Sequence, residues 1–151
     1  MAGGSRLRLA VRGLLLHQNR LLLVNAWPGG TSDLLCAPGG GVEPHQSLPD
    51  NLIREMHEET GLTVAVESPV LVNEFHSPDR AFHQVDVYYR CRLLAGDPHG
   101  EWVDPEGVVT ERRWVTREEI GRYRFKPDTL PDVAWDHEGQ AAYDPLELLV
   151  R

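Results

Sequence analysis

Hydrophobic residues form short runs that alternate with polar or glycine-rich breaks through most of the chain. Residues 6–16 and 20–27 are aliphatic runs separated by His17-Gln18-Asn19, which predicts a β-hairpin because Asn tolerates turn conformations. Residues 83–94 show the clearest two-residue alternation, which is typical of a strand with one buried face. We expect that face to carry His83, Val85, Val87, Tyr89, Cys91 and Leu93. Further extended segments are predicted at 62–66, 69–75 and 108–115, with loops at 28–33 and 95–107.

The strongest helix signal lies in the middle of the chain, from about residue 48 to 60. Ser47 suits the N-cap position, and Asp50 three residues later completes a capping-box pattern. Pro49 fits the first turn, where a missing N–H costs nothing. Gly61 supplies the C-terminal stop, so both ends of this helix are marked by the sequence.

Hairpins, mixed strands and one central helix predict an α+β fold, with an α/β/α sandwich favoured over a bundle or barrel. A short capped helix is expected at 116–120. The length of 151 residues fits one domain, 1–151, with a core of about 6–121. The tail, 122–151, is rich in Pro, Asp and aromatic residues and has no steady period, so its structure is left open.

The charge balance restricts the partners. Lys and Arg total 15 and Asp and Glu total 23, a formal net charge of −8, which gives no broad attraction to nucleic acid or to an anionic membrane. A polyphosphate substrate would therefore need a bound cation to reverse the local charge. The sequence contains no apolar run of membrane-spanning length and no signal-peptide core, so we expect a cytoplasmic protein. It leaves open whether that protein is a monomer or a homodimer.

Three glutamates crowd the end of the central helix. Glu55, Glu58 and Glu59 fall within an arc of about 100°, beside the apolar face and near the C-terminus, where the helix dipole disfavours negative charge. A divalent cation such as Mg²⁺ removes this conflict, because hard cations prefer clustered carboxylate oxygens. The alternative is an ordinary solvated acidic face. The glycines at 39–41 favour the cation, because their backbone can approach a phosphate or a metal closely.

Together these residues resemble the signature of the Nudix hydrolases, of MutT type: G-x5-E-x7-R-E-U-x-E-E-x-G-U, where U is aliphatic. Counted from Gly40, every fixed position matches except one, where Gln46 replaces the first glutamate. The positions that match after it are Arg54, Glu55, Met56, Glu58, Glu59, Gly61 and Leu62. The resemblance implies the Nudix sandwich, in which a mixed β-sheet carries the motif helix on one side.

The resemblance also implies an activity: Mg²⁺-dependent hydrolysis, with Mn²⁺ able to substitute, of a pyrophosphate bond in a nucleoside diphosphate linked to another moiety. By the same resemblance Glu58 and Glu59 bind the metal, Glu55 is a further ligand or positions water, and the Gly39 carbonyl completes the coordination. Arg54 would orient the glutamates, and Gly40 would lie against the substrate.

Gln46 is the one departure from the signature. In the family the residue at this position commonly pairs with the motif arginine, and Gln lacks the charge, so we expect Arg54 to be held less firmly and catalysis to be weakened. The alternative is a non-catalytic module that binds or senses nucleotides. Within the enzyme class, nucleoside triphosphates, ADP-ribose, sugar nucleotides and dinucleoside polyphosphates stay open, with a slight preference for triphosphates because the chain is short.

Other residues are weaker candidates. Glu106 lies in the loop where such proteins often place a general base or an extra metal ligand, and Glu101 and Glu111 lie beside it. Arg80 is the best candidate in the 76–83 loop for a phosphate clamp, although an ordinary surface position is the commoner role of such an arginine. Several aromatic side chains could stack on a base, although core packing is their commoner role: Trp27, Phe75, Phe82, Tyr88 and Trp135.

Overall fold

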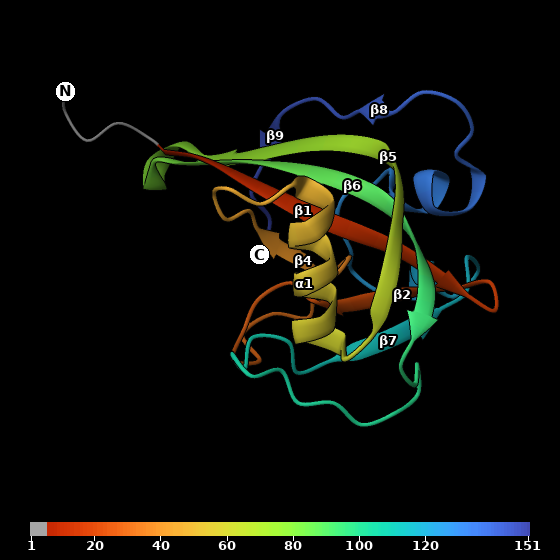
Figure 1. Ribbon diagram of the computed structural model, residues 1–151. Helices are drawn as coiled ribbons and strands as arrows, with labels where there is room; N and C mark the ends of the chain where they lie inside the picture. The colour runs from red at the N-terminus through yellow and green to blue at the C-terminus, as the bar shows by residue number, and fades with distance from the viewer. Residues whose placement is uncertain (1–5) are drawn as a thin grey trace.

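The computed structural model describes residues 6–151, in which long strands are joined by short turns around one α-helix (Figure 1). The longest elements are β1, β5, β6 and α1, and the short ones complete the sheet or cap it. The elements are β1 (Arg6–His17), β2 (Arg20–Asn25), β3 (Leu35–Cys36), β4 (Gly39–Gly41), α1 (Leu48–Thr60), β5 (Thr63–Ser77), η1 (Pro78–Arg80), β6 (Phe82–Ala95), β7 (Arg112–Val115), η2 (Ile120–Arg122), η3 (Asp132–Asp136), β8 (Ala142–Tyr143) and β9 (Glu147–Leu148).

The sheet is mixed. β1 runs parallel to β6 and antiparallel to β2 and β4, whereas β5 is antiparallel to β6 and carries β8 and β9 in parallel along its outer edge. Helix α1 lies across one side of this sheet (Figure 1). The predicted α+β fold, with a mixed sheet and the motif helix on one side, is confirmed. The opposite side is covered by the short 3-10 helix η2 and the short π-helix η3 instead of a second long helix.

Two apolar cores lie on the two faces of the central strands. On one face Val11 and Leu15 pack with Leu52 and Met56 of α1, and on the other Leu14 and its neighbours pack against the segment after β7. Successive side chains of a strand point to opposite faces, so β1 and β6 are buried on both. The expectation of one buried face on β6 was therefore incomplete: Gln84, Asp86 and Tyr88 on its other face are only 2% exposed.

The sequence signals for α1 are confirmed at both ends. The Ser47 hydroxyl accepts a hydrogen bond from the Asp50 N–H at 3.1 Å, and the helix ends at Gly61, whose N–H donates to the His57 carbonyl at 2.8 Å. Gly61 has a φ of 73°, and an added Cβ would lie 2.5 Å from the ring of Trp102. Glycine is therefore required here for its backbone and for its size.

Two extended segments differ from expectation. Residues 62–66 and 69–75 form one strand, β5, whose register shifts between Val66 and Leu71. The strand expected at 108–115 shrinks to β7, because the N–H groups of 108–111 donate to side chains instead of a ladder. The acceptors are the carboxylate of Asp104 and the amide oxygen of Asn25.

The capped helix expected at 116–120 is instead a turn that leads into η2. The Thr116 hydroxyl accepts from the Glu119 N–H at 3.1 Å, so the cap is present but α-helix does not follow. The tail continues into the second core through Leu130 and Val133 and then pairs with β5. No helix among residues 6–151 is both long enough and apolar enough to cross a membrane.

We expect Gly61→Ala to lower the free energy of unfolding by about 2–4 kcal/mol, because the new methyl group adds a clash with Trp102 to the cost of a left-handed backbone. Gly139→Ala is the matched control. Its φ is 84° but no atom lies within 4 Å of the added Cβ, so only the backbone cost of about 1–2 kcal/mol applies. Urea unfolding of both variants measures the difference, and equal losses would contradict the packing argument.

Candidate active site

A cavity of about 650 Å³ opens on the sheet face opposite α1. Its floor is formed by β1, β6 and β5, whose side chains Arg8, Arg12, Gln84, Asp86 and Asn73 face it. One rim is the glycine strand β4 together with the glutamates of α1, and the opposite rim is Leu148 and the residues that follow β9. The site expected from the motif therefore lies at one end of a long pocket.

The predicted carboxylates meet the predicted glycines at that end. Glu55, Glu58 and Glu59 all line the pocket, and the Gly39 N–H donates to Oε2 of Glu59 at 2.9 Å. An added Cβ at Gly39 would lie 1.9 Å from the Val11 carbonyl oxygen, and one at Gly40 would lie 2.6 Å from the Glu55 carboxyl carbon. Gly39 is thus required for the close approach of β4 to β1, and Gly40 is required so that the Glu55 carboxylate can pack against the backbone.

Burial makes this cluster electrostatically unfavourable. It raises the pKa of the Glu59 carboxyl to about 7, although the Arg12 charge and the Gly39 N–H both act to lower it. Burial likewise raises the pKa of Glu55, and the negative charge of Glu58 raises that pKa further. Two ionised, partly desolvated carboxylates side by side favour a counter-charge at this position.

A loop after β6 brings a fourth carboxylate to the cluster. Glu106 lines the pocket, and its charge contributes to the raised pKa of Glu55. The loop is held by Asp104, which is 4% exposed and accepts from the N–H groups of Glu106, Val108 and Val109 at 2.8–3.1 Å. The sequence analysis missed Asp104. Its signal is the turn pattern of residues 104–107, Asp-Pro-Glu-Gly.

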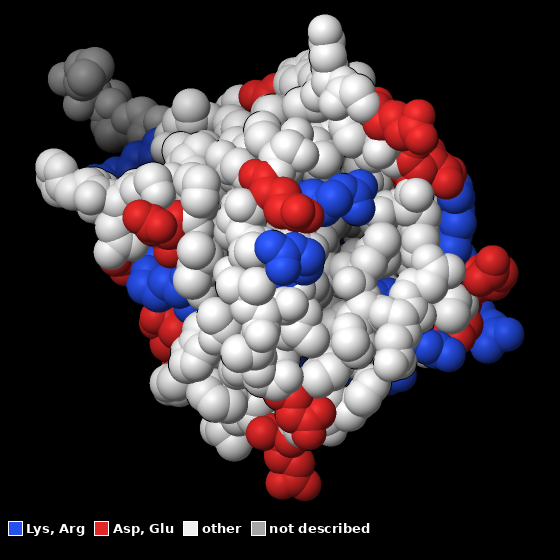
Figure 2. Space-filling view, turned by 45° about the vertical axis from the view of Figure 1, so that its right-hand side comes forward, with Lys and Arg blue, Asp and Glu red and all other residues white. Residues whose placement is uncertain are grey.

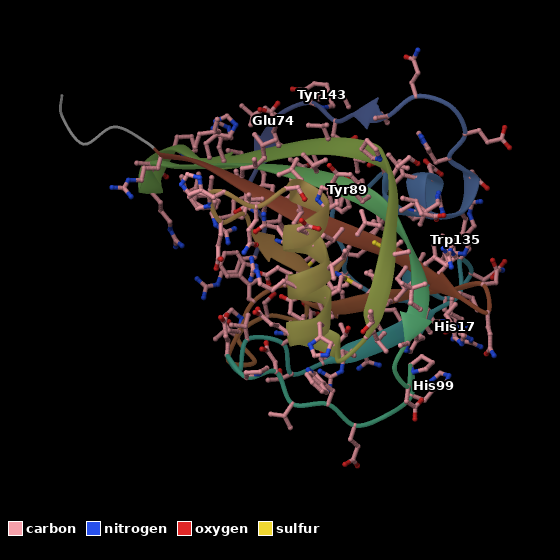
Figure 3. All side chains as sticks on the ribbon, viewed as in Figure 1. His17, Glu74, Tyr89, His99, Trp135 and Tyr143 are labelled. Atoms are coloured by element: carbon pink, nitrogen blue, oxygen red, sulfur yellow. The ribbon has the colours of Figure 1, made fainter. Side chains whose placement is uncertain are left out.

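The other sequence candidates divide into two groups. Arg80 lines the pocket as an exposed residue of η1, and four of the five aromatic side chains line it too. Trp135 does not. Its indole N–H donates to the Asn19 carbonyl at the hairpin turn, at the end of the molecule where Figure 3 also labels His17. Of the remaining acidic candidates, Glu101 and Glu111 lie outside the pocket.

The residues of the pocket floor were not found from the sequence. The Arg12 side chain is held by the Asp86 carboxylate at 3.3 Å and by the Ala37 carbonyl at 3.3 Å. Their signal was present as polar residues on the second face of otherwise apolar strands, at Arg8 and Arg12 of β1 and at Gln84 and Asp86 of β6. To recognise this signal, one must know that both faces of β1 and β6 are covered by other parts of the protein.

Charges elsewhere are mostly paired locally. On the face drawn in Figure 2, acidic and basic side chains lie beside one another in small groups instead of forming a broad basic patch. Exposed ion pairs such as Arg117 with Asp136 and Arg124 with Asp33 account for several such neighbours in the chain. The pocket is thus a separate place where carboxylates and arginines converge.

Residues 6–135 match the NUDIX domain, and this range contains the whole carboxylate cluster. The chain belongs to the Nudix hydrolase family. A mouse protein, nucleoside diphosphate-linked moiety X motif 6, is 32% identical over 131 residues, which are 87% of this chain and 39% of the mouse protein. An ADP-ribose pyrophosphatase from Methanocaldococcus jannaschii is 30% identical over 132 residues, 86% of this chain and 68% of that protein. The chain therefore spans well under half of the mouse relative.

Solved structures show the same Nudix fold. A Nudix hydrolase from Nitrosomonas europaea superposes with a TM-score of 0.70 at 20% identity, and the match covers 85% of this chain and 86% of the other. Proteins described as MutT are also among the structures that match. The resemblance inferred from the signature is thereby confirmed for the family and the fold.

The motif arginine is better held than Gln46 suggested. Arg54 donates to Glu55 at 3.1 Å and to the amide oxygen of Asn51 at 3.0 Å, and it pairs with Glu58 at 3.5 Å and Glu43 at 3.9 Å. Gln46 is exposed, and no hydrogen bond within residues 6–151 joins its side chain to Arg54. The expected loosening of Arg54 is found only at Nε, which is buried with no hydrogen-bond partner among the described residues, while its other contacts hold the guanidinium in place.

Asn51 takes over the connecting role and was missed by the sequence analysis. It is 0% exposed, accepts from the Glu43 N–H at 2.9 Å and from Arg54, and donates to the Gln46 and Ser47 carbonyls at 3.2 and 2.8 Å. One amide thus ties the loop before α1 to the motif arginine.

The donor set fits a divalent cation in kind. Within residues 6–151, no three His, Cys, Asp or Glu side chains already converge as in a formed metal centre. Nevertheless Glu55, Glu58 and Glu59 supply carboxylate oxygens at one rim, two of them at a cost in burial, and Gly39 supplies backbone beside them. Hard cations such as Mg²⁺ prefer oxygen donors of this type.

We expect metal-free protein to lose stability as pH rises from about 4.5 to about 7, because Glu59 has its pKa raised on folding and must ionise while buried. Glu59→Gln removes this cost. In EDTA the variant should match the wild type at pH 4.5 and exceed it at pH 8 by at most about 3 kcal/mol. Urea unfolding at both pH values measures this, and Glu67→Gln, at an exposed position, is the control. An equal gain at both pH values would contradict it.

We expect Asn51→Ala to cost about 2–4 kcal/mol of stability and to lower kcat about tenfold, because it leaves part-buried groups of Glu43, Gln46 and Arg54 without their partner. Gln46→Ala, at an exposed side chain, should change stability by less than about 0.5 kcal/mol. Gln46→Glu should leave activity the same or slightly higher. Denaturant unfolding and steady-state kinetics test all three, and a larger effect from Gln46→Ala than from Asn51→Ala would overturn the assignment.

Proposed function

We propose that the protein is a divalent-metal-dependent pyrophosphohydrolase that cleaves a nucleoside diphosphate linked to another moiety. The observation that carries this proposal is the meeting of three motif carboxylates with the Gly39–Gly41 backbone at one end of an open pocket. The family supplies the reaction type, and the pocket supplies room for a substrate beyond the pyrophosphate.

The proposed metal site consists of Glu55, Glu58 and Glu59 with the Gly39 carbonyl, and it would take Mg²⁺ or Mn²⁺. When bound, the cation neutralises the pyrophosphate, lowers the pKa of water and stabilises the leaving phosphate. Arg54 keeps two of the glutamates in place through its ion pairs.

Glu106 is the proposed proton acceptor. It faces the cluster from a loop separate from α1, so it can serve the attacking water without giving up a ligand of the cation. Asp104 holds this loop through three backbone N–H groups, which fixes the position from which Glu106 acts. Removal of Asp104 would therefore affect the reaction through Glu106.

The length of the pocket favours a substrate with groups on both sides of the pyrophosphate. From β4 across β1, β6 and β5 to β9 there are four strand spacings of about 4.8 Å, or about 19 Å. Phe75, Phe82 and Trp27 line the pocket away from the carboxylates and offer faces for a base or ribose. ADP-ribose is the first compound to test, since it appears in the name of the archaeal relative, and triphosphates are next.

The non-catalytic alternative has less support. It rested on Gln46, and Arg54 is held without that residue. We also propose that the protein acts on free nucleotides in the cytoplasm, because its net charge of −8 opposes binding to nucleic acid. Nucleotide binding without hydrolysis across a broad panel would restore the sensor as the better description.

We expect Mg²⁺-dependent release of a nucleoside monophosphate from at least one compound in a panel of ADP-ribose, sugar nucleotides, dinucleoside polyphosphates and triphosphates, resolved by chromatography. Glu58→Gln should lower kcat by about 100-fold or more, because it removes a charged oxygen donor, while the fold is kept. Glu67→Gln, on the exposed part of β5, is the charge-matched control and should be fully active. Near-normal activity of Glu58→Gln would overturn the metal assignment.

A further inference from the structure

A chain of hydrogen bonds crosses the pocket floor from β1 to β6 and back. Arg12 Nε donates to Oδ2 of Asp86 at 3.3 Å, and Gln84 Nε2 donates to Oδ1 of the same carboxylate at 2.6 Å. Oε1 of Gln84 in turn accepts from Nη1 of Arg8. None of these four residues belongs to the Nudix motif, and all four line the cavity.

The donor and acceptor groups of these side chains fix the direction of each hydrogen bond in the series. The Asp86 carboxylate only accepts hydrogen bonds, so the amide of Gln84 must present its NH₂ to Asp86 and its oxygen to Arg8. Both Gln84 and Asp86 are 2% exposed, so neither can exchange these partners for bulk water. A buried ion pair between Arg12 and Asp86 adds little net stability on its own, and its value here is to orient what it holds.

Arg8 is the accessible end of the chain. Its guanidinium lies against Gly41, where an added Cβ would be 2.7 Å from Nη2, and it lies close enough to Glu55 for the two charges to interact. The residue as a whole is exposed within the pocket, and only Nη1 is engaged by Gln84. Arg8 lines the cavity beside the carboxylate cluster, and no hydrogen bond joins its Nε or Nη2 to another residue that the structure describes.

We propose that Arg8 binds a phosphate group of the substrate and that Gln84 and Asp86 are positioning residues that aim it. This inference rests on the proposed function and adds the anion contact that the acidic cluster lacks. A planar guanidinium with one donor fixed retains a fork for phosphate oxygens. Arg12 is already committed to Asp86 and Ala37, and Arg80 lies on the exposed turn η1, so Arg8 is the arginine that is both held and available.

Binding of ADP, measured by calorimetry in EDTA and again with Mg²⁺, tests Arg8 without turnover. Arg8→Gln should weaken binding about 10-fold to 100-fold, the range for hydrogen bonds to a charged group. Arg8→Lys should recover part of the loss, because it keeps the charge but not the fork. Arg92→Gln, at an exposed position on β6 outside the pocket, removes the same charge and should bind ADP normally.

Gln84→Met tests the positioning role, since it keeps the length of the side chain and removes both hydrogen bonds. It should raise KM several-fold with little change in kcat, and adding it to Arg8→Gln should cause no further rise, because its effect acts through Arg8. A structural role alone would instead give additive losses, with kcat reduced as well. Urea unfolding of each variant confirms that folded protein is compared.

The outcomes separate the two proposals. If ADP binding depends on Arg8 but no compound of the panel is hydrolysed, the phosphate site stands and the proposed reaction is wrong. If hydrolysis is found and Arg8→Gln leaves both Kd and KM unchanged, the reaction stands and the role of Arg8 is overturned. Failure of the wild-type protein to bind ADP at millimolar concentration would also overturn it.

Discussion

The hydrogen bond from the Gly39 N–H to Glu59 is the contact on which the site depends. It holds a buried carboxylate against a backbone that only glycine can adopt, because a Cβ at Gly39 would overlap the Val11 carbonyl. Strand β4 pairs with β1 at the same residues, so the ladder that closes the sheet also fixes the helix carboxylates at the pocket rim. The unfavourable burial of Glu59 and Glu55 is the cost of this arrangement, and the proposed cation would offset it.

One face of the central strands packs in the core under α1, and the other face carries both the second core and the pocket. Helix α1 covers one face through Leu52 and Met56, and only its glutamates reach around the edge to the other side. The second face is apolar at one end, where the tail packs, and polar at the other, where the pocket opens. A strand buried on both faces can therefore carry Val87 for the core and Asp86 for the site at adjacent positions.

Local signals were predictable from the sequence and long-range ones were not. The ends of α1 follow from Ser47 and Gly61, because capping depends on residues a few positions apart. The site carboxylates were predicted from their crowding on one helix together with the glycine loop and the resemblance to the Nudix signature. Asn51 was missed because three of its four partners lie in the loop before α1, and a single Asn in a helix has no distinctive pattern. The tail was left open because two-residue strands such as β8 form only where an edge already exists to pair with.

The proposed cation and Arg8 would together allow an acidic protein to act on an anionic substrate. The chain carries −8 overall, yet the proposed cation site at one rim of the pocket and the guanidinium of Arg8 beside it would supply local positive charge for phosphates. Bulk attraction is not needed once these groups are held in advance, because fixed donors avoid the cost of reorganisation on binding. The buried pair of Gln84 and Asp86 serves the proposed arrangement, since their hydrogen bonds hold one nitrogen of the Arg8 guanidinium on the pocket floor.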